Sequence, residues 1–379
     1  MRVAIIGGSY AGLCAALSLR CAGVEATVYE RSRDYDRTGG GIVVQPDFAE
    51  YLEGFGYARP QVVAVPTSRR VFLRRDGSIA GKTRDATFYT GWDTLLKTLR
   101  DAVGSGGIVN NHELCRLEQT ESEVKLSFVD GTMQRADLVV AADGIGSFIR
   151  RQLLPDVSPR FAGYVGYRGV IPEREMPVET LKIALDSFVL FSYPNSHILA
   201  YLIPGSDGSV EPGHRRFNWV WYLGKADQDL SEVLTDRSGH THRSSLAPGE
   251  MRDAARERLI RRASEELPAS MSAAVQATSD PFVQAIFDLA VPSMVHGRVV
   301  LVGDAAYLVR PHTASGTSKA AGDSVSLGHA LANENNDLSA ALSEWESERQ
   351  AVAKHIMAVG LRIAAANGLG ATVGRREDA

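Results

Sequence analysis

Three stretches of this chain consist almost entirely of hydrophobic residues, and each is short enough to form a single strand. They span residues 3–6, 138–142 and 299–302, and a glycine or an aspartate follows each of them directly. Unbroken apolar runs of this length are typical of strands that are buried on both faces of a parallel sheet. After the first run, residues 13–19 have helical spacing, and residues 24–29 alternate like a second strand. The pattern predicts strand, turn, helix and strand within 30 residues, which indicates an α/β fold.

A different pattern fills the middle of the chain. Residues 188–193, 198–203 and 217–223 are rich in aromatic and β-branched side chains, and turn sequences separate them. Such segments predict strands of an antiparallel sheet, and on the last of them the large apolar residues at every second position share one face. Residues 338–366 place hydrophobic residues at helical spacing among charged ones, which predicts a long helix that packs on the first unit.

Composition and charge exclude several classes of function. The chain has 379 residues, which is enough for two domains, and its formal net charge of -4 leaves no broad basic surface for nucleic acid. No run of about 18 apolar residues is present, so we expect no membrane partner. The three cysteines favour a reducing cytoplasm over a disulfide framework, and no cluster of cysteine and histidine predicts a metal site.

The turn after the first strand reads Gly7-Gly8-Ser9-Tyr10-Ala11-Gly12. A glycine turn between a strand and a helix lets backbone amides approach a pyrophosphate, which the positive end of the helix then holds. Gly12 lets the helix pack closely on the strand, and Glu30 is placed to accept the ribose hydroxyls of an adenosine. Ser9 stands where a GxGxxG fingerprint has its middle glycine. With the strand, the helix and the terminal acid in place, we still predict a bound dinucleotide.

Two further acidic motifs follow buried strands much later in the chain. Asp143-Gly144 follows residues 138–142, and Gly303-Asp304 follows residues 299–302. Open α/β sheets bind their ligands at the carboxyl ends of the strands, so we expect these motifs to meet at one ligand. In this order the three motifs resemble those of the aromatic-hydroxylase family of flavoproteins, which includes para-hydroxybenzoate hydroxylase. The resemblance implies that Asp304 holds the ribityl chain of FAD and that Asp143 helps to bind both FAD and the nicotinamide cofactor.

The resemblance also implies an activity. Members of this family are single-component monooxygenases that use FAD, O2 and NADH or NADPH to hydroxylate a small electron-rich aromatic ring through a flavin C4a-hydroperoxide. We find no second strand-glycine-helix unit, so we expect the nicotinamide cofactor to bind transiently. Residues 41–46 and 294–298 most resemble members that act on dihydroxypyridines, so we expect a dihydroxypyridine-like or phenolic substrate. We further expect a homodimer.

These observations together predict an α/β fold, α+β overall, with a Rossmann-type FAD-binding domain and an inserted, mainly antiparallel β-sheet substrate domain. We assign residues 1–70, 97–165 and 282–379 to the FAD-binding domain. We assign residues 71–96 and 166–281 to the substrate domain.

The candidate site residues follow from the same motifs. The amides of Gly316, Thr317 and Ser318 begin a helix and are candidates for stabilising the anion of reduced flavin. Electrophilic hydroxyl transfer requires the substrate to lose a proton, for which we predict His312, with Pro311 beside it, as the catalytic pair. We expect substrate contacts at Gln45, Tyr193, Tyr201, Trp221 and Tyr222. From the resemblance we expect cofactor contacts at Gly7, Ser9, Tyr10, Ala11, Gly12, Glu30, Arg31, Val43, Leu114, Asp143, Gly303 and Asp304.

Two alternatives remain open from the sequence. Residues 219–224 partly resemble the WxWxIP motif of flavin-dependent halogenases, although the Ile-Pro end is absent. A non-catalytic FAD-binding protein is the second alternative, because no residue in the chain is an obligatory nucleophile. Trp92 also stands where many hydroxylases have an arginine that contacts the flavin, so we do not assign that role to it.

Overall fold

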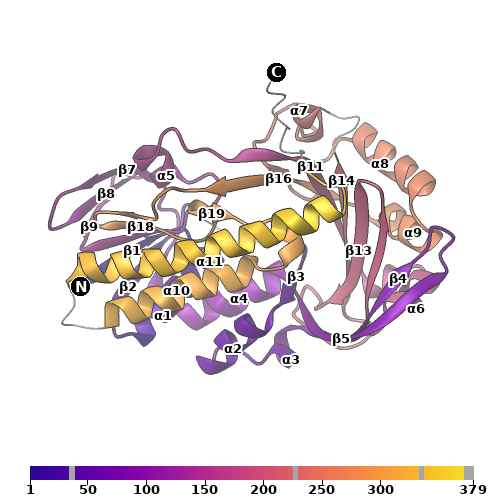
Figure 1. Ribbon diagram of the computed structural model, residues 1–379, viewed down its shortest axis with the longest axis horizontal. Coiled ribbons are helices and arrows are strands. Elements are labelled where there is room, and N and C mark those ends of the chain that lie inside the picture. The colour runs from indigo at the N-terminus through magenta and orange to yellow at the C-terminus, as the bar shows by residue number, and fades with distance from the viewer. Residues whose placement is uncertain (34–38, 225–228, 333–336, 371–379) are drawn as a thin grey trace, which may run out of the picture.

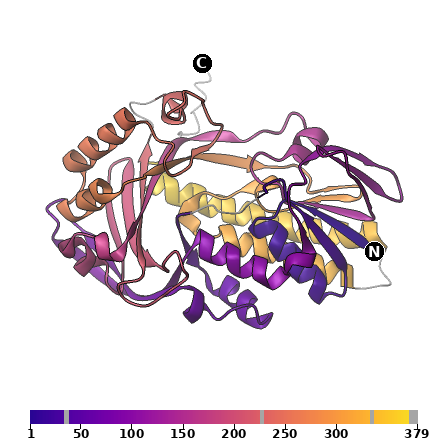
Figure 2. The same cartoon turned by 180° about the vertical axis from the view of Figure 1, so that it is seen from behind.

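Two large sheets and a layer of long helices make up most of the protein. The structure is a computed structural model that describes residues 1–33, 39–224, 229–332 and 337–370. In Figure 1 the helices α1, α4, α10 and α11 lie below the strands of the first sheet, and the second sheet stands at the other end of the molecule. Figure 2 shows the same arrangement from behind, with α10 and α11 on the far side.

The first sheet has six strands in the order β17-β18-β10-β1-β2-β6. All neighbouring strands are parallel except β17 and β18. The strands are β1 (Arg2–Ile6), β2 (Glu25–Tyr29), β6 (Ile108–Val109), β10 (Leu138–Ala141), β17 (Val295–His296) and β18 (Val299–Leu301). The three central apolar runs are fully buried, as expected for strands covered on both faces. The predicted Rossmann-type unit is therefore confirmed.

Helices cover one face of this sheet. They are α1 (Tyr10–Cys21), α4 (Trp92–Val103), α10 (Gly316–Ala332) and α11 (Leu338–Ala366). A Cβ atom added at Gly328 of α10 would lie 3.0 Å from the carbonyl oxygen of Ser18 in α1, so the two helices pack closely. The long helix predicted over residues 338–366 is confirmed, and its Trp345 is buried against α10. A small antiparallel sheet, β7 (Leu114–Gln119), β8 (Val124–Phe128) and β9 (Met133–Ala136), lies at the outer edge.

The second sheet is mainly antiparallel, and only β12 and β4 run parallel in it. Its strand order is β15-β16-β11-β14-β13-β12-β4-β5-β3, with β19 paired to β16. The strands are β3 (Gly41–Val44), β4 (Val65–Leu73), β5 (Ile79–Gly91), β11 (Arg160–Pro172), β12 (Ser187–Tyr193), β13 (Ser196–Ile203), β14 (Arg216–Gly224), β15 (Ser245–Leu246), β16 (Phe282–Ala290) and β19 (Tyr307–Leu308). The three strands predicted in this region are confirmed.

Seven shorter helices complete the fold: α2 (Pro46–Gly54), α3 (Pro60–Val63), α5 (Phe148–Leu153), α6 (Val178–Ala184), α7 (Leu230–Val233), α8 (Asp253–Glu266) and α9 (Ala269–Ala277). Helices α6, α8 and α9 lie on the outer face of the second sheet (Figure 1). The predicted domain boundaries at 70/71, 96/97 and 165/166 fall within β4, α4 and β11, so these elements would be shared between the two domains. The division itself stays a prediction.

Candidate active site

A cavity of about 670 Å³ lies between the inner face of the second sheet and the carboxyl end of the first. This volume falls in the range of sites that enclose small molecules and cofactors. Thirteen of the predicted site residues line it: Ser9, Tyr10, Ala11, Val43, Gln45, Tyr201, Tyr222, Gly303, Asp304, Pro311, His312, Gly316 and Thr317. Gly144 of the Asp-Gly motif also lines the cavity, although Asp143 itself does not, so the three distant motifs converge on one space.

Gly7 and Gly12 leave room for the turn that follows β1. A Cβ atom at Gly12 would lie 1.8 Å from the carbonyl oxygen of Gly7, and one at Gly7 would lie 2.4 Å from the carbonyl oxygen of Ala142. Gly7 also has a φ of 110°, which side chains other than glycine rarely adopt. Ser9, the residue before α1, makes no side-chain cap with this helix. The first backbone amides of α1 therefore have no cap from the Ser9 side chain. The positive N-terminal end of this helix faces the cavity.

Glu30 lies at the end of β2 and is 6% exposed. One carboxylate oxygen accepts from the amide of Gly8 at 2.7 Å, and the other accepts from the amide of Ser32 at 2.8 Å. These bonds fix the carboxylate beside the glycine turn, where the sequence placed the adenosine ribose. Arg31 beside it is exposed.

Asp143 follows β10, and its side chain is partly buried, with the Oδ1 atom shielded from solvent. The Oδ2 atom accepts from the amide of Ile149 at 3.2 Å, whereas Oδ1 has no partner among the described residues. Burial raises the pKa of the Asp143 carboxyl above its usual value, and hydrogen bonds from Ser147 and Ile149 partly offset this. An unpaired buried oxygen costs free energy, which a ligand hydroxyl group or amide would recover.

Arg150 connects the two acidic motifs. Its side chain is buried, and it donates to the carbonyl oxygen of Ala305 at 2.9 Å and to that of Ile145 at 2.5 Å. The first carbonyl follows Asp304 and the second lies two residues after Asp143. Burial lowers the pKa of Arg150, and the nearby Asp143 carboxylate opposes that shift.

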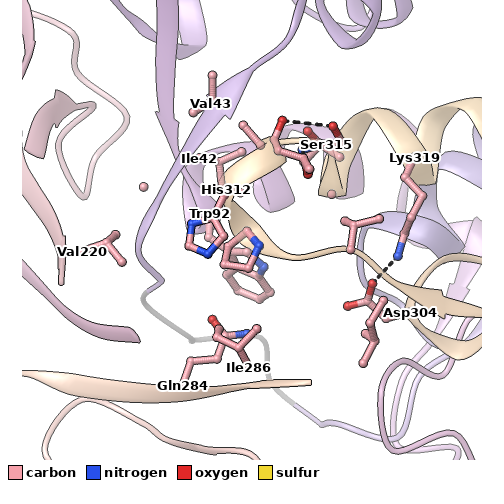
Figure 3. A pocket seen from close by; sticks show the side chains of 18 of the residues that line it. Ile42, Val43, Trp92, Val220, Gln284, Ile286, Asp304, His312, Ser315 and Lys319 are labelled. Carbon is pink, nitrogen blue, oxygen red and sulfur yellow. Dashed lines mark hydrogen bonds and ion pairs between the residues drawn. The ribbon is translucent and has the colours of Figure 1, made fainter. Parts of the chain in front are cut away.

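Asp304 is half-exposed at the cavity, and the side chain of Lys319 of α10 reaches its carboxylate. The ammonium of Lys319 lies 2.5 Å from Oδ1 of Asp304 (Figure 3). The preceding Gly303 has a φ of 58°, and a Cβ atom there would lie 2.6 Å from the Cβ of Ala11. The Gly-Asp turn can therefore approach the glycine turn of β1 only because residue 303 lacks a side chain.

The N-terminus of α10 also points at the cavity. Ser315, Gly316 and Thr317 line it, and the hydroxyl of Thr317 is buried without a partner among the described residues. The side chain of Ser318 turns away and donates to Asp47 of α2 at 2.7 Å. Of the three predicted residues at this helix start, Ser318 can therefore contribute its backbone amide but not its hydroxyl.

Two histidines, the buried His197 and the partly buried His312, lie together where the cavity meets the second sheet. His312 comes from the loop between β19 and α10, and His197 comes from β13, with ring centroids 5.1 Å apart. Tyr164 bonds to Nε2 of His312 at 2.8 Å, and the rings of Tyr222 and His312 meet edge to face at 4.7 Å. In Figure 3, Gln284 points from β16 into the space in front of His312. These side chains form a polar end in an otherwise apolar part of the cavity.

Burial keeps both imidazoles neutral. It lowers the pKa of His197 to about 4, and it lowers the pKa of His312 to about 3, with contributions from His197 and Arg310. The Nδ1 atom of each ring has no partner among the residues that the structure describes. A neutral imidazole whose Nε2 is bonded to Tyr164 can offer its Nδ1 to a ligand hydroxyl group.

Strands β13 and β14 of the second sheet alternate between the cavity and the helices outside. On β13, His197, Leu199 and Tyr201 face the cavity, and on β14, Val220 and Tyr222 do so. Tyr193 and Trp221 have the opposite parity and pack in the outer core, where Tyr193 donates to Glu266 of α8 at 2.5 Å. The predicted substrate contacts of Tyr193 and Trp221 are therefore wrong, because side chains on adjacent strand positions cannot share a face.

The same alternation removes the support for a halogenase. Trp219 and Trp221, on which that resemblance rested, both lie in the outer core. Trp219 donates to the hydroxyl of Thr278 at 2.9 Å rather than to anything in the cavity.

Other predicted contacts have different surroundings. Leu114 begins β7 and is buried in the core of the first unit rather than at the cavity, so its contact with the cofactor stays a prediction. Gln45 makes a long hydrogen bond of 3.4 Å to the carbonyl oxygen of Thr313, in the loop that carries His312. Val43 lines the cavity from β3.

The lining residues that sequence reasoning missed include four polar or charged ones, Arg168, His197, Gln284 and Lys319. His197 could have been found by combining the strand period with Tyr201, which lies four residues later on the same face. Lys319 gave no such signal, because a lysine on a helix is usually solvated.

No described helix is both long and apolar enough to cross a membrane.

Several features of the site fit FAD. The hydroxyl of Thr317, which lines the cavity, has no partner among the described residues, and the same holds for Oδ1 of Asp143, next to the lining residue Gly144. The turns at Gly7, Gly12 and Gly303 leave space at the backbone, and two helix N-termini face the cavity. Uncapped helix starts favour pyrophosphate and the anionic side of a reduced flavin. A dinucleotide could run from Glu30 past Asp304 to the histidine end.

Comparison with known proteins agrees with this geometry. A family model described as "FAD binding domain-like" matches residues 161–288. The 2,6-dihydroxypyridine 3-monooxygenase of Paenarthrobacter nicotinovorans is 35% identical over 360 residues, which cover 92% of this chain and 87% of that protein. The chain belongs to the FAD-dependent aromatic hydroxylases. The resemblance predicted from the three motifs is confirmed, and FAD is the cofactor.

Two further relatives support the assignment. The structure of 2,6-dihydroxypyridine-3-hydroxylase from Arthrobacter nicotinovorans has a TM-score of 0.91 and 31% identity to this hydroxylase, covering 100% of this chain and 95% of that chain. The 6-hydroxynicotinate 3-monooxygenase of Bordetella bronchiseptica is 24% identical, covering 86% of this chain and 81% of that protein. The hydroxylase is thus similar along nearly its full length to monooxygenases that act on small aromatic rings.

Proposed function

We propose that this hydroxylase inserts one oxygen atom of O2 into a hydroxylated pyridine or a similar electron-rich heteroaromatic ring. The observation that carries this proposal is the pair of neutral histidines, the buried His197 and the partly buried His312, at one end of the cavity that would hold FAD. Bound FAD would accept a hydride from NADH or NADPH and activate O2. The chain's own residues would bind the ring, remove its hydroxyl proton and exclude water.

His312 is the proposed proton acceptor. In the tautomer with hydrogen on Nε2, this atom donates to the hydroxyl oxygen of Tyr164 and a lone pair remains on Nδ1. A hydroxyl group on the substrate ring would donate to this atom, and the resulting oxyanion makes the ring more reactive toward an electrophilic oxygen. The negative charge formed beside the imidazole would raise its pKa and so favour the transfer.

His197, Tyr222 and Gln284 would position the ring. They approach the same space from β13, β14 and β16, and they present an imidazole, a phenol and an amide. These groups can satisfy both donors and acceptors along the edge of a hydroxylated pyridine, whereas an unsubstituted hydrocarbon ring would leave them unpaired. The names of the two dihydroxypyridine-oxidising relatives point to the same substrate class.

The inner face of the second sheet would keep water from the reaction. Leu199, Val220 and Ile286 line the cavity beside the polar end. Their strands β13, β14 and β16 are backed by the outer core and helices α8 and α9. A dry cavity strengthens the hydrogen bonds to the substrate and limits the loss of activated oxygen as peroxide.

The decisive test is a substrate panel. Purified protein with bound FAD should oxidise NADH or NADPH faster, with matching oxygen uptake, when a dihydroxypyridine is added than when a benzoate is added. Mass spectrometry should find the substrate mass increased by one oxygen atom. Faster oxidation without a hydroxylated product would indicate an uncoupled oxidase, and no acceleration by any ring would favour a non-catalytic flavoprotein.

A matched pair of variants links the activity to the histidine end. His312→Asn should lose hydroxylation while it keeps FAD, whereas His355→Gln, at an exposed histidine of α11, should behave as wild type. Equal hydroxylation rates in both variants would exclude His312 from the reaction.

Three further assignments are part of the proposal. The nicotinamide cofactor binds transiently, the enzyme works in the cytoplasm, and two copies form a homodimer. Light scattering at micromolar concentration would show twice the mass of 40.9 kDa if the dimer forms.

Limited proteolysis would test the two-domain division, since cleavage should fall between residues 166 and 281 before it reaches the FAD-binding part.

A further inference from the structure

Lys319 is a buried cation at the cofactor end of the cavity. It lies one turn into α10 and is 2% exposed. Its ammonium donates to Oδ1 of Asp304 at 2.5 Å and to the carbonyl oxygen of Tyr307 at 2.6 Å, and it lies 4.6 Å from the centroid of the Tyr307 ring. A buried ammonium group is unfavourable unless charge and hydrogen bonds compensate it, and these contacts supply both.

The two partners of this ion pair differ sharply in exposure. The side chain of Lys319 is 1% exposed, whereas that of Asp304 is 55% exposed. Within the described part of the chain, no hydrogen bond reaches the second oxygen of Asp304, Oδ2. Lys319 therefore fixes the carboxylate from the interior and leaves its other oxygen available on the cavity side.

The backbone of the same turn is held by a second buried ion pair. The amide of Gly303 donates to Asp323 at 3.1 Å, and Arg349 of α11 donates to Asp323 at 2.8 Å. Tyr307 joins the two pairs, because its hydroxyl donates to Asp323 and its carbonyl accepts from Lys319. The Gly-Asp turn is thus held at its backbone by Asp323 and at its side chain by Lys319.

We propose that Lys319 is a positioning residue for FAD. It orients the Asp304 carboxylate so that Oδ2 meets the ribityl chain, and it balances the carboxylate charge that faces the cofactor. A carboxylate anchored at one oxygen loses less rotational freedom on binding than a free one, so the anchored group binds FAD more tightly. This inference rests on the proposed contact between Asp304 and the ribityl chain.

The experiment is a double-mutant cycle on FAD release. The holoenzymes of wild type, Lys319→Met, Asp304→Asn and the double variant are diluted, and the rise of free-flavin fluorescence gives the release rate. Each single change should speed release by about tenfold, the effect of losing one hydrogen bond to a charged group. The double variant should release FAD no faster than Asp304→Asn alone, because Lys319 acts through Asp304.

The outcomes separate the two assignments. If Asp304→Asn releases FAD like wild type, the proposed role of Asp304 fails and the Lys319 inference fails with it. If Asp304→Asn releases FAD quickly but Lys319→Met does not, only the Lys319 inference is overturned. Effects that multiply in the double variant would show that the two residues act independently, which also overturns it.

A conservative replacement tests whether the charge matters. Lys319→Arg keeps a cation next to Asp304 and should slow FAD release relative to Lys319→Met. The visible circular dichroism of the bound flavin reports its fixed orientation. The spectrum of Lys319→Arg should therefore be closer to that of wild type than the spectrum of Lys319→Met. Lys319→Gln keeps a donor without the charge and serves if Lys319→Met does not fold. Release from Lys319→Arg as fast as from the uncharged variants would assign Lys319 to packing alone.

Discussion

The hydroxyl of Tyr164 lies 2.8 Å from Nε2 of His312, and the two rings stack with an interplanar angle of 20°. Burial raises the pKa of Tyr164 well above its usual value, so the phenol stays protonated. The guanidinium carbon of Arg310 lies over the ring of Tyr164, 5.7 Å from its centroid, and Arg310 forms a two-bond ion pair with Asp288. The imidazole of His312 is thus held in one orientation by a partner that is itself fixed.

This relationship predicts how two variants differ in turnover. His312→Asn removes the proposed proton acceptor, and kcat should fall by about a hundredfold, as for the loss of a general base. Tyr164→Phe leaves the imidazole in place without its orienting partner, so kcat should fall only about tenfold. Stopped-flow measurement of product formation, with flavin content as a control, distinguishes the two. An equal loss in both variants would contradict separate roles for the two residues.

The two lowered histidine pKa values predict a pH dependence of stability. The unfolded chain gains protons at these residues below about pH 6.5, whereas the folded protein holds His197 neutral to about pH 4 and His312 to about pH 3. Their contribution to stability is therefore complete above pH 6.5 and is lost progressively as the pH falls toward 4 and then 3. The free energy of unfolding should decrease by about 1.4 kcal/mol per pH unit for each histidine in this window.

Urea unfolding of the FAD-saturated enzyme between pH 7 and 4.5 measures this effect. In His197→Gln the free energy of unfolding should fall less steeply with decreasing pH, by the contribution of one histidine. His355→Gln, at an exposed site, should show the same pH dependence as wild type. A His197→Gln slope identical to wild type would mean that this ring is protonated in the folded enzyme.

Adjacent positions on β14 should affect different properties. Tyr222 faces the cavity and contacts His197 and His312, whereas Trp221 donates to Ser196 at 3.0 Å on the outer face. Tyr222→Phe should therefore raise KM for the ring substrate by several fold and leave Tm unchanged. Trp221→Phe should lower the free energy of unfolding by about 2 kcal/mol and leave KM unchanged. Steady-state kinetics and thermal unfolding of both variants check this, and a reversed pattern would overturn the assignment of the faces.

That pair of residues also shows what the sequence could predict and what it could not. Apolar runs that end at Gly7, Asp143 and Gly303 identified the parallel sheet and the cofactor turns, because strand burial and glycine geometry are local properties. The period of two on β14 showed that Trp221 and Tyr222 point in opposite directions. It could not show which of them meets the cavity, because both faces of the sheet are covered. Only the packing of α8 and α9 on one face decides that.

Charged and polar residues inside the site were the hardest to predict. Lys319 lies on a helix, where a lysine is usually solvated. The period of two on β13 puts His197 on the same face as Tyr201 but does not show that this face meets the cavity. Their burial depends on Asp304, which lies 15 residues away in the chain, and on His312, which lies on a different element. Such pairings arise from tertiary contacts, which periodicity does not encode.

The glycine turn gives a test of the cofactor end. In Gly12→Ala the new methyl group would lie 1.8 Å from the carbonyl oxygen of Gly7, so the helix and the turn must separate. This variant should lose FAD and about 3 kcal/mol or more of stability. Gly54→Ala is the matched control, because a Cβ atom there has no neighbour within 4 Å, and it should keep both. Yellow, FAD-saturated Gly12→Ala protein would contradict the close packing of α1 on the turn.

Arg150 provides a test of the link between the two acidic motifs. Its guanidinium is 1% exposed and holds the carbonyl oxygens of Ile145 and Ala305, so Arg150→Met would leave both without this donor. The unfolding free energy should fall by about 3 kcal/mol, since each unpaired buried carbonyl costs about 1–3 kcal/mol. FAD affinity should fall too, because Asp143 and Asp304 would lose their common anchor. Arg151→Met, at the exposed neighbouring arginine, is the control for helix α5. If both variants bind FAD with equal affinity in a fluorescence titration, the two motifs are positioned independently of Arg150.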